Sequence, residues 1–453
     1  MKELISYGCP LLQKLNLSRN GLTGTLPLSA GKLLNLEHLD VSSNSLDGSI
    51  SDVHFLNLTN LTYLDLSFNS FAHLDISNAG ISDHIPGWFW DLPRGLRFLN
   101  LSSNEIKGML PNMTSDFYRY PGMDLSYNQL EGTIPVLPSK LATLNLSGNK
   151  FSVTLYFLCQ IDKSLTFLDL SNNLFSGSIP ACLQKFQENL VVLNLSNNSL
   201  SGEIPSSLGS LSQLQALYLR KNAFVGEIPA SLSNCTKLRF VDLGENKLSG
   251  NIPTWIGEKL SELVMLVIWF NKLEGSLPHQ MCLLNNLQIL DLSDNGLSGN
   301  IPRCFGNFTA MATRWFLDDI ISHSYTSYVS APHRTQQNFE TPQGTQNNFI
   351  SYDNLCPELG GSYYSCDSNK EALFIDNALV AWKGTRREFG RGLYLLKSID
   401  ISSNMLYGKL PDEITNLLDL ISLNLSNNKL QGQIPKHIDR LTFLESLDLS
   451  RCR

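Results

Sequence analysis

The sequence predicts an α/β solenoid: a right-handed superhelix with a parallel sheet on its concave side and short 3-10 or irregular segments on its convex side. Two observations support this prediction. A pattern written LxxLxLxxNxLxGxIP returns about every 24 residues, and residues 214–229 are one copy. Such a period indicates stacked units, because one unit cannot bury its own apolar face. The LxL core of each copy alternates apolar and polar residues, which is the periodicity of a β-strand.

The second leucine of the pattern marks where each strand is expected. This marker occurs sixteen times along the chain. The marker residues are Leu15, Leu39, Leu64, Leu74, Leu99, Met123, Leu144, Leu168, Leu193, Leu217, Val241, Leu266, Leu290, Ile399, Leu423 and Leu447. The Asn of each copy lies where the chain leaves the strand, and we expect its buried amide to bind backbone groups of the turns above and below.

Two steps between markers depart strongly from the period. Only 10 residues separate Leu64 from Leu74, which indicates a shortened repeat, and 109 separate Leu290 from Ile399. The longer step contains an island insertion of about 85 residues. We therefore expect repeats over residues 1–312, the island over residues 313–393, and further repeats over residues 394–453, the last of them truncated. The alternative for the island is a linker without fixed structure.

Composition excludes several classes of partner. The net charge is −7 with no basic stripe, so nucleic acid is not an expected partner. No signal peptide is visible at Met1 and no apolar run reaches 18 residues, so no membrane span is expected in this chain. Both ends lack the capping units that a solenoid needs, which indicates a fragment or a truncated product.

The nine cysteines favour an oxidising compartment. Cys159 and Cys182 occupy nearly equivalent places in adjacent copies, as do Cys282 and Cys304, and stacked repeats bring such positions within disulfide distance. A third expected pair, formed by Cys356 and Cys366, brackets a Gly-Gly turn in the island. The alternative is that all nine are small buried apolar residues.

Eleven N-x-S/T triplets predict N-glycosylation and point to the same compartment, although the repeat string LNLS itself generates five of them. Their asparagines are Asn16, Asn57, Asn60, Asn100, Asn112, Asn145, Asn194, Asn197, Asn234, Asn307 and Asn424. Six of them fall on the concave face, and none falls on the strands marked by Leu217, Val241, Leu266, Leu290 or Ile399.

Three consecutive copies carry unusual residues where most copies have Asp or Asn, Ser and Asn. Clustered aromatic residues and arginines dominate binding surfaces, so we expect these side chains to face solvent and to contact a ligand or co-receptor. The candidates are Tyr218, Arg220, Lys221, Arg239, Phe240, Asp242, Glu245, Trp269 and Phe270, joined by Lys383, Arg386, Arg387 and Phe389 of the island. The alternative is repeat drift, with Trp269 packed on a neighbouring loop.

No catalytic residue, cofactor or metal site is expected. Aspartates form a broken ladder on the concave face, and paired carboxylates can hydrolyse glycosides, but the repeat itself explains each of them. The eight histidines and the cysteines lack metal-ligand spacing, and no phosphate-binding loop, hydrolase or kinase motif occurs.

The LxGxIP ending is similar to the plant-specific class of extracellular leucine-rich repeats. Residues 77–90, 304–311, 381–390 and 395–400 further resemble plant receptor-like proteins of the ethylene-inducing-xylanase-receptor type. The resemblance implies a leucine-rich-repeat superhelix that belongs to a cell-surface immune receptor. Such a receptor lies on the extracellular side of the plasma membrane, binds a protein or peptide ligand, and signals through co-receptor and adaptor receptor kinases.

The chain departs from this family in its island, where the family carries Lys-x5-Tyr and Lys383 is followed instead by Phe389. Two alternatives to the receptor remain open. One is a soluble, wall-associated inhibitor of a secreted hydrolase, which the long island disfavours because such inhibitors are shorter and lack one. The other is a truncated product that does not signal.

Overall fold

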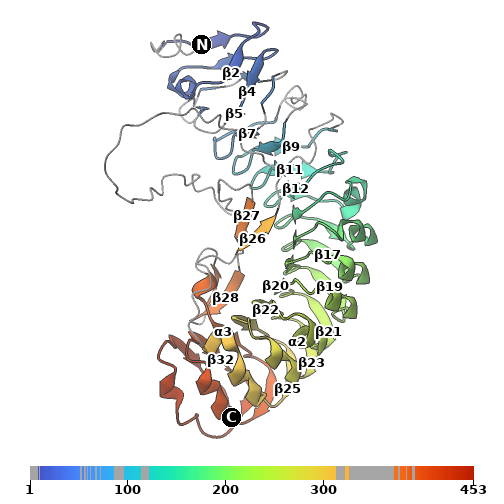
Figure 1. Cartoon of the computed structure of the whole chain (residues 1–453), viewed down its shortest axis with the longest axis vertical. Coiled ribbons are helices and arrows are strands. Elements are labelled where there is room, and N and C mark those ends of the chain that lie inside the picture. Colours follow the sequence, from blue (N-terminus) through green and yellow to red (C-terminus); the bar gives the residue numbers. More distant parts are fainter. Residues whose placement is uncertain are drawn as a thin grey trace, which may run out of the picture.

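The computed structural model is a solenoid whose strands follow one another along an arc (Figure 1). It describes residues 9, 11–50, 54–55, 58, 60–61, 63–66, 69–71, 73–85, 96–113, 122–312, 322–325, 372–375, 378–383, 385–389 and 393–452. Within these ranges, no helix combines the length and the apolar character needed to cross a membrane.

The concave side is built from short parallel strands. Each of the sixteen marker residues is the middle residue of a three-residue strand, as predicted. The concave strands are β1 (Lys14–Asn16), β3 (His38–Asp40), β5 (Ser49–Ile50), β6 (Tyr63–Asp65), β7 (His73–Asp75), β8 (Phe98–Asn100), β10 (Gly122–Asp124), β12 (Thr143–Asn145), β14 (Phe167–Asp169), β16 (Val192–Asn194), β18 (Ala216–Tyr218), β20 (Phe240–Asp242), β22 (Met265–Val267), β24 (Ile289–Asp291), β30 (Ser398–Asp400), β32 (Ser422–Asn424) and β34 (Ser446–Asp448). Neighbours pair marker to marker, as Leu193 does with Leu217.

The LxG part of the pattern forms a second set of parallel strands beside the first. Eight of them form one sheet, three another and two a third. These strands are β2 (Thr23–Thr25), β4 (Ser45–Asp47), β9 (Lys107–Gly108), β11 (Gln129–Gly132), β13 (Lys150–Phe151), β15 (Ser176–Gly177), β17 (Ser199–Glu203), β19 (Ala223–Gly226), β21 (Lys247–Asn251), β23 (Lys272–Ser276), β25 (Gly296–Gly299), β31 (Met405–Gly408) and β33 (Lys429–Leu430). The repeat glycine is needed because its backbone is left-handed, with φ of 81° at Gly226.

Short 3-10 segments follow the Ile-Pro pair and line the outer side of the arc (Figure 1). A proline immediately precedes most of them, where its missing N–H is not needed. The 3-10 segments are η1 (Leu28–Lys32), η4 (Leu155–Gln160), η5 (Ala181–Phe186), η6 (Ser206–Ser210), η7 (Ala230–Asn234), η8 (His279–Leu283), η9 (Arg303–Asn307), η10 (Leu393–Leu395), η11 (Asp412–Asn416) and η12 (Ile438–Arg440). Among the described residues there are also two short helices, α2 (Trp255–Lys259) and α3 (Thr309–Ala312).

An asparagine ladder joins adjacent repeats inside the solenoid. The Asn128 amide donates to the carbonyls of Leu101, Leu125 and Ser126 at 2.9–3.2 Å, and its oxygen accepts the N–H of Ile106 at 3.0 Å. This arrangement confirms the predicted role of the repeat asparagine. The pattern leucines fill the core around it, as Leu144 does with no exposed surface.

The shortened repeat interrupts the concave sheet. Strands β1, β3 and β6 form a separate three-stranded sheet, which ends at Leu64. The next marker strand, β7, pairs instead with β5, with Ile50 opposite Leu74. Because the 10-residue step is too short for a full turn of the solenoid, β6 is not followed by a partner in register, and the long sheet begins anew at β5.

The island is inserted between two adjacent repeats. Strand β24 pairs directly with β30, and the Asn404 amide donates across the insertion to the carbonyl of Leu292 at 3.0 Å. Within the described part of the island, β26 (Ser322–Tyr325) pairs with β27 (Ala372–Ile375), and β28 (Ala378–Trp382) pairs with β29 (Thr385–Phe389), both antiparallel. We call the second pair, residues 378–389, the hairpin. The expected pair Cys356 and Cys366 lies outside the described residues.

Candidate functional site

Most concave strands end in the same polar turn. In β24, the Asp291 side chain accepts the N–H of Ser293 at 3.1 Å and its hydroxyl at 2.6 Å. Asp400 and Ser402 repeat the arrangement on β30. An aspartate that binds the backbone two residues later stabilises a turn, so the ladder of aspartates has a structural role along the sheet.

Three adjacent strands, β18, β20 and β22, depart from this turn. Tyr218 and Val267 stand where other copies have Asp or Asn, and Arg220, Gly244 and Trp269 stand where most copies have Ser. Only β20 keeps the capping carboxylate, which accepts the N–H of Gly244 at 3.0 Å. The departures therefore replace the small polar turn residues by two aromatic side chains, one valine, one glycine and one arginine in the middle of the concave face.

The hairpin lies over this part of the concave face. Its Ala378 and Val380 are each 2% exposed and share one apolar cluster with Tyr218 and Phe240. Our prediction that these side chains face solvent is wrong for Tyr218 and Phe240, and also for Asp242, because all three are buried. For Tyr218 and Phe240, the physical reason is that the island supplies apolar residues to the same cluster. Asp242 is buried as the turn aspartates Asp124 and Asp169 are.

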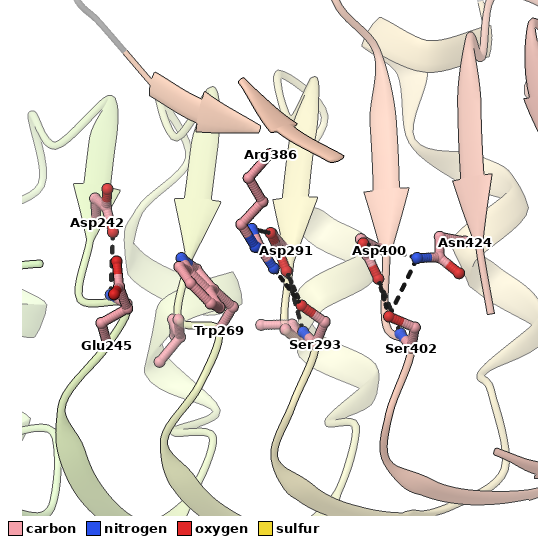
Figure 2. A network of polar contacts seen from close by, with 12 residues as sticks. Asp242, Glu245, Trp269, Asp291, Ser293, Arg386, Asp400, Ser402 and Asn424 are labelled. Carbon is pink, nitrogen blue, oxygen red and sulfur yellow. Dashed lines mark hydrogen bonds and ion pairs between the residues drawn. The ribbon is translucent and has the colours of Figure 1, made fainter. Parts of the chain in front are cut away.

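Arg386 is the polar centre of the hairpin contact (Figure 2). Its Nη1 lies 2.5 Å from Oδ2 of Asp291, and its Nη2 donates to Oγ of Ser293 at 2.8 Å. Its guanidinium carbon lies 3.5 Å from the ring centroid of Trp269. An arginine thus meets a carboxylate, a hydroxyl and the face of an aromatic ring at once, which are the three groups that best match its charge and planar shape.

Gly244 makes room for the indole in this arrangement. A Cβ at position 244 would lie 2.6 Å from both Cδ1 and Nε1 of Trp269. Trp269 therefore packs on the neighbouring turn, as the drift alternative proposed, yet it also holds Arg386. Sequence reasoning missed Gly244, although its departure from Ser between Arg220 and Trp269 is visible in the pattern. It missed Asp291 and Ser293 because both match the repeat.

Arg220 is engaged within the solenoid. Its Nε lies 3.7 Å from Oδ2 of Asp242, and its Nη1 lies 3.4 Å from Oε1 of Glu245. Burial raises the pKa of Asp242 to about 6, although the Arg220 charge opposes this shift. These residues therefore hold one another in place, and the arginine is only partly exposed.

Two of the predicted residues stay open to solvent beside the hairpin. Phe270 is 60% exposed and Lys221 is also exposed, with the half-buried Glu245 on the turn between them. All three take a left-handed backbone conformation, with φ of 51–55°. Such a conformation suits Asn and is strained for a bulky side chain, so the position of Phe270 in the repeat does not explain its presence. We call Lys221, Glu245 and Phe270 the turn row.

The remaining predicted residues lie around the hairpin. Arg239 is half-buried, with its guanidinium carbon 6.0 Å from the ring centroid of Phe240. Lys383 binds Glu445 of the repeats beyond the island at 3.1 Å, and Phe389 meets Trp382 edge-on with 6.1 Å between ring centroids. Arg387 is exposed.

Buried carboxylates elsewhere on the concave face have shifted pKa values. Burial raises the pKa of Asp169 and of Asp400 to about 6, and the nearby Asp291 charge contributes to the shift at Asp400. Both accept hydrogen bonds from the serine two residues later, as in the other turns. Across the described ranges, no three His, Cys, Asp or Glu side chains are grouped so that they could hold a metal ion.

Two of the three expected cysteine pairs are disulfide bonds in the structure. Cys159 and Cys182 are joined, as are Cys282 and Cys304, each pair with 5.6 Å between Cα atoms. Both bonds link adjacent 3-10 segments of the convex side. They therefore clamp neighbouring repeats on the face opposite the hairpin.

The glycosylation triplets differ in accessibility. Asn100 and Asn145 are buried, and the Asn145 amide donates to Asp124 at 3.1 Å, so the folded chain leaves no room for the glycans predicted there. The reason is that a concave LNLS asparagine is part of the turn ladder. The exposed triplet asparagines are Asn16, Asn60, Asn112, Asn234 and Asn307. The half-buried ones are Asn194, Asn197 and Asn424. Asn57 lies outside the described residues.

Comparison with known families identifies the repeats. Two leucine-rich-repeat family models match segments that together cover more than half of the chain. The segments are residues 10–71 for one model and residues 60–92, 95–117, 164–186, 189–211, 213–235, 237–258, 286–308, 395–417 and 419–441 for the other.

Curated relatives confirm the resemblance that the sequence motifs indicated. Receptor-like protein EIX2 of Solanum lycopersicum is 39% identical over 174 residues, which are 30% of this chain and 17% of that protein. Receptor-like protein EIX1 of the same plant is 40% identical over 134 residues, or 21% of this chain and 13% of that protein. The chain thus spans less than a fifth of the length of these relatives.

Solved structures of plant receptor ectodomains have the same fold. The peptide hormone receptor RGFR1, in complex with RGF2, has a TM-score of 0.58 and 26% identity over 99% of this chain and 56% of that chain. The Arabidopsis receptor kinase HAESA, with the peptide hormone IDA and the co-receptor SERK1, has a TM-score of 0.54 and 27% identity over 98% of this chain and 67% of that chain.

Proposed function

Because the chain belongs to the leucine-rich-repeat family, we propose that it is the ligand-recognition part of a plant cell-surface receptor-like protein. In this role it lies on the extracellular side of the plasma membrane, binds a protein or peptide ligand, and acts through receptor-kinase partners. The similarity to EIX2 and EIX1 and to hormone-bound receptor ectodomains supports this assignment. The two disulfide bonds suit an oxidising, extracellular compartment.

The observation that carries the proposal is the composite surface on the concave face. The turn row presents a cation, an anion and an aromatic ring side by side, and the docked hairpin adds the exposed Arg387. Aromatic and arginine side chains contribute most of the energy at protein interfaces. Phe270 is 60% exposed, and its tilted contact with Trp269, with 6.0 Å between ring centroids, leaves most of its ring in solvent. A strained residue with so much exposed surface favours a role in binding.

The experiment uses the chain secreted from plant cells and immobilised. A display library of random 12-residue peptides is selected on it, and binding of the purified SERK1 ectodomain is measured separately. We expect enriched peptides whose affinity falls at least tenfold in a Phe270→Asn variant. The matched control is Tyr127→Asn, because Tyr127 occupies the same left-handed turn position, with φ of 52°, in a distant repeat.

Two results would count against the receptor assignment. Equal loss of peptide binding in both variants would show that the turn row has no special role. Inhibition of a secreted cell-wall hydrolase by the chain, without selected peptides or SERK1 binding, would favour the wall-associated inhibitor instead.

A further inference from the structure

We propose that Trp269, Asp291 and Ser293 form an arginine-binding subsite, which Arg386 fills in the free chain and which an arginine-bearing peptide ligand occupies by displacing the hairpin. This inference rests on the proposed function as a peptide receptor and adds the chemical class of the ligand. We call these three residues the arginine subsite.

The subsite is built for a guanidinium group. Asp291 is 2% exposed and Ser293 is 1% exposed, yet both direct an oxygen toward Arg386. The indole of Trp269 lies beside the guanidinium of Arg386 (Figure 2), with 3.5 Å between the guanidinium carbon and the ring centroid. Gly244 leaves the space that this ring position requires. A lysine ammonium has neither the rigid fork of two donors nor a flat face to stack on the indole, so the arrangement discriminates between the two cations.

The surroundings favour a cationic ligand. Asp400 lies opposite Asp291 in the register of β24 and β30, and Asp242 lies two strands away on β20. Arg220 partly compensates Asp242, whereas Asp400 is held by the neutral Ser402 and Asn424. With Asp291 in the subsite, Asp400 beside it and, of the three, only Asp242 paired with a cation of the described solenoid, the local charge favours a cation when the hairpin leaves.

The hairpin can leave without breaking the solenoid. The Asn404 amide and the pairing of β24 with β30 continue the repeat ladder beneath it. The hairpin consists of two five-residue strands, and such a pair has little stability by itself. A further charged contact, between Lys383 and Glu445, is exposed on both sides and contributes little.

Displacement of the hairpin would uncover an apolar platform next to the subsite. Tyr218 and Phe240 belong to the same cluster as the buried hairpin residues Ala378 and Val380. A ligand that replaces the hairpin therefore needs an arginine flanked by apolar or aromatic residues. The sequence of the hairpin itself, with Trp382 and Phe389 on either side of Arg386, has this composition.

The test uses the hairpin sequence as a probe. A synthetic peptide of residues 378–389 is titrated into the full chain and into its Arg386→Gln variant, whose own hairpin no longer fills the subsite. We expect the variant to bind the peptide at least tenfold more tightly than the unchanged chain. The same peptide with Gln or Lys at the Arg386 position should bind roughly ten- to hundredfold more weakly, since charge-assisted bonds and stacking are lost.

A second variant separates the subsite from the rest of the surface. Adding Asp291→Asn to Arg386→Gln should abolish the preference for arginine, whereas adding Lys383→Gln should leave it unchanged. Equal binding of the arginine and glutamine peptides, or no binding to Arg386→Gln, would overturn the proposal and leave Arg386 with a purely structural role. Selected library peptides that bind through Phe270 but contain no arginine would also overturn the arginine subsite. They would still support the proposed receptor function.

Discussion

Gly244 and Trp269 lie on adjacent turns, and the indole of Trp269 occupies the space that any side chain at position 244 would need. A Cβ there would come within 2.6 Å of the ring, whereas ordinary contacts begin near 3.4 Å. This pair determines where the indole lies, and the indole in turn covers Arg386. Several measurable consequences follow from this and related contacts.

Replacing Gly244 with alanine should move Trp269 and loosen the hairpin. The backbone of Gly244 is not left-handed, so the effect is steric. Overpacking of this kind costs about 1–3 kcal/mol, which thermal unfolding and hydrogen exchange of the hairpin amides would measure. In a Trp269→Ala background the same change should cost much less, because the clash is gone. Equal costs in both backgrounds would refute the steric explanation.

Removing the amide of Asn128 should destabilise the solenoid strongly. Alanine at this position removes the Asn128 partner of the Leu101 and Leu125 carbonyls and of the Ile106 N–H. The Ser126 carbonyl, which also loses Asn128, keeps the N–H of Ser103. We expect a loss of roughly 2–4 kcal/mol in the free energy of unfolding. Asn20→Ala is the control, since Asn20 is exposed and its amide donates to the carbonyl of Ser18 within its own turn. Similar losses of unfolding free energy at both positions would contradict the explanation that the Asn128 amide matters because it is buried.

Replacing Phe270 with asparagine should separate binding from stability. The change relieves a strained left-handed phenylalanine and introduces the residue that stands at this turn position in Asn172, Asn197 and Asn427. The free energy of unfolding should stay the same or rise by about 1 kcal/mol, while ligand affinity falls. A clear drop in melting temperature would mean that the contact of Phe270 with Trp269 stabilises the fold.

Replacing Asp169 with asparagine should change how stability depends on pH. Burial raises the pKa of Asp169 from 3.8 to about 6, so the folded chain holds this proton more tightly than the unfolded chain. The protonated side chain therefore contributes stability below pH 3.8, and this contribution is lost as the pH rises through about 6.

We expect the Asp169→Asn variant to gain stability relative to the unchanged chain between these two pH values, with a constant difference above them. Asparagine fits the turn, since Asn145 and Asn194 cap the neighbouring strands. Melting temperatures measured from pH 3.5 to about 7.5 would test this. A difference that is independent of pH would contradict the burial of an ionisable carboxyl group here.

Much of the fold was predictable, and the candidate site was predictable only in part. The markers placed all sixteen strands, and the unusual residues on β18, β20 and β22 correctly located the irregular region. Their exposure was not predictable, because Tyr218 and Phe240 are covered by a hairpin more than a hundred residues away in the sequence. Asp291 could not be singled out, because it has the residue type that the repeat requires.

The sequence by itself determined the solenoid, the register of its strands and the asparagine ladder. Each depends on contacts between equivalent positions one period apart, so a pattern along the chain contains them. Only the tertiary structure decided which part of the concave face is covered and which residues meet there. Arg386 reaches Asp291 across 95 residues, and no periodicity links an inserted hairpin to the strand on which it docks.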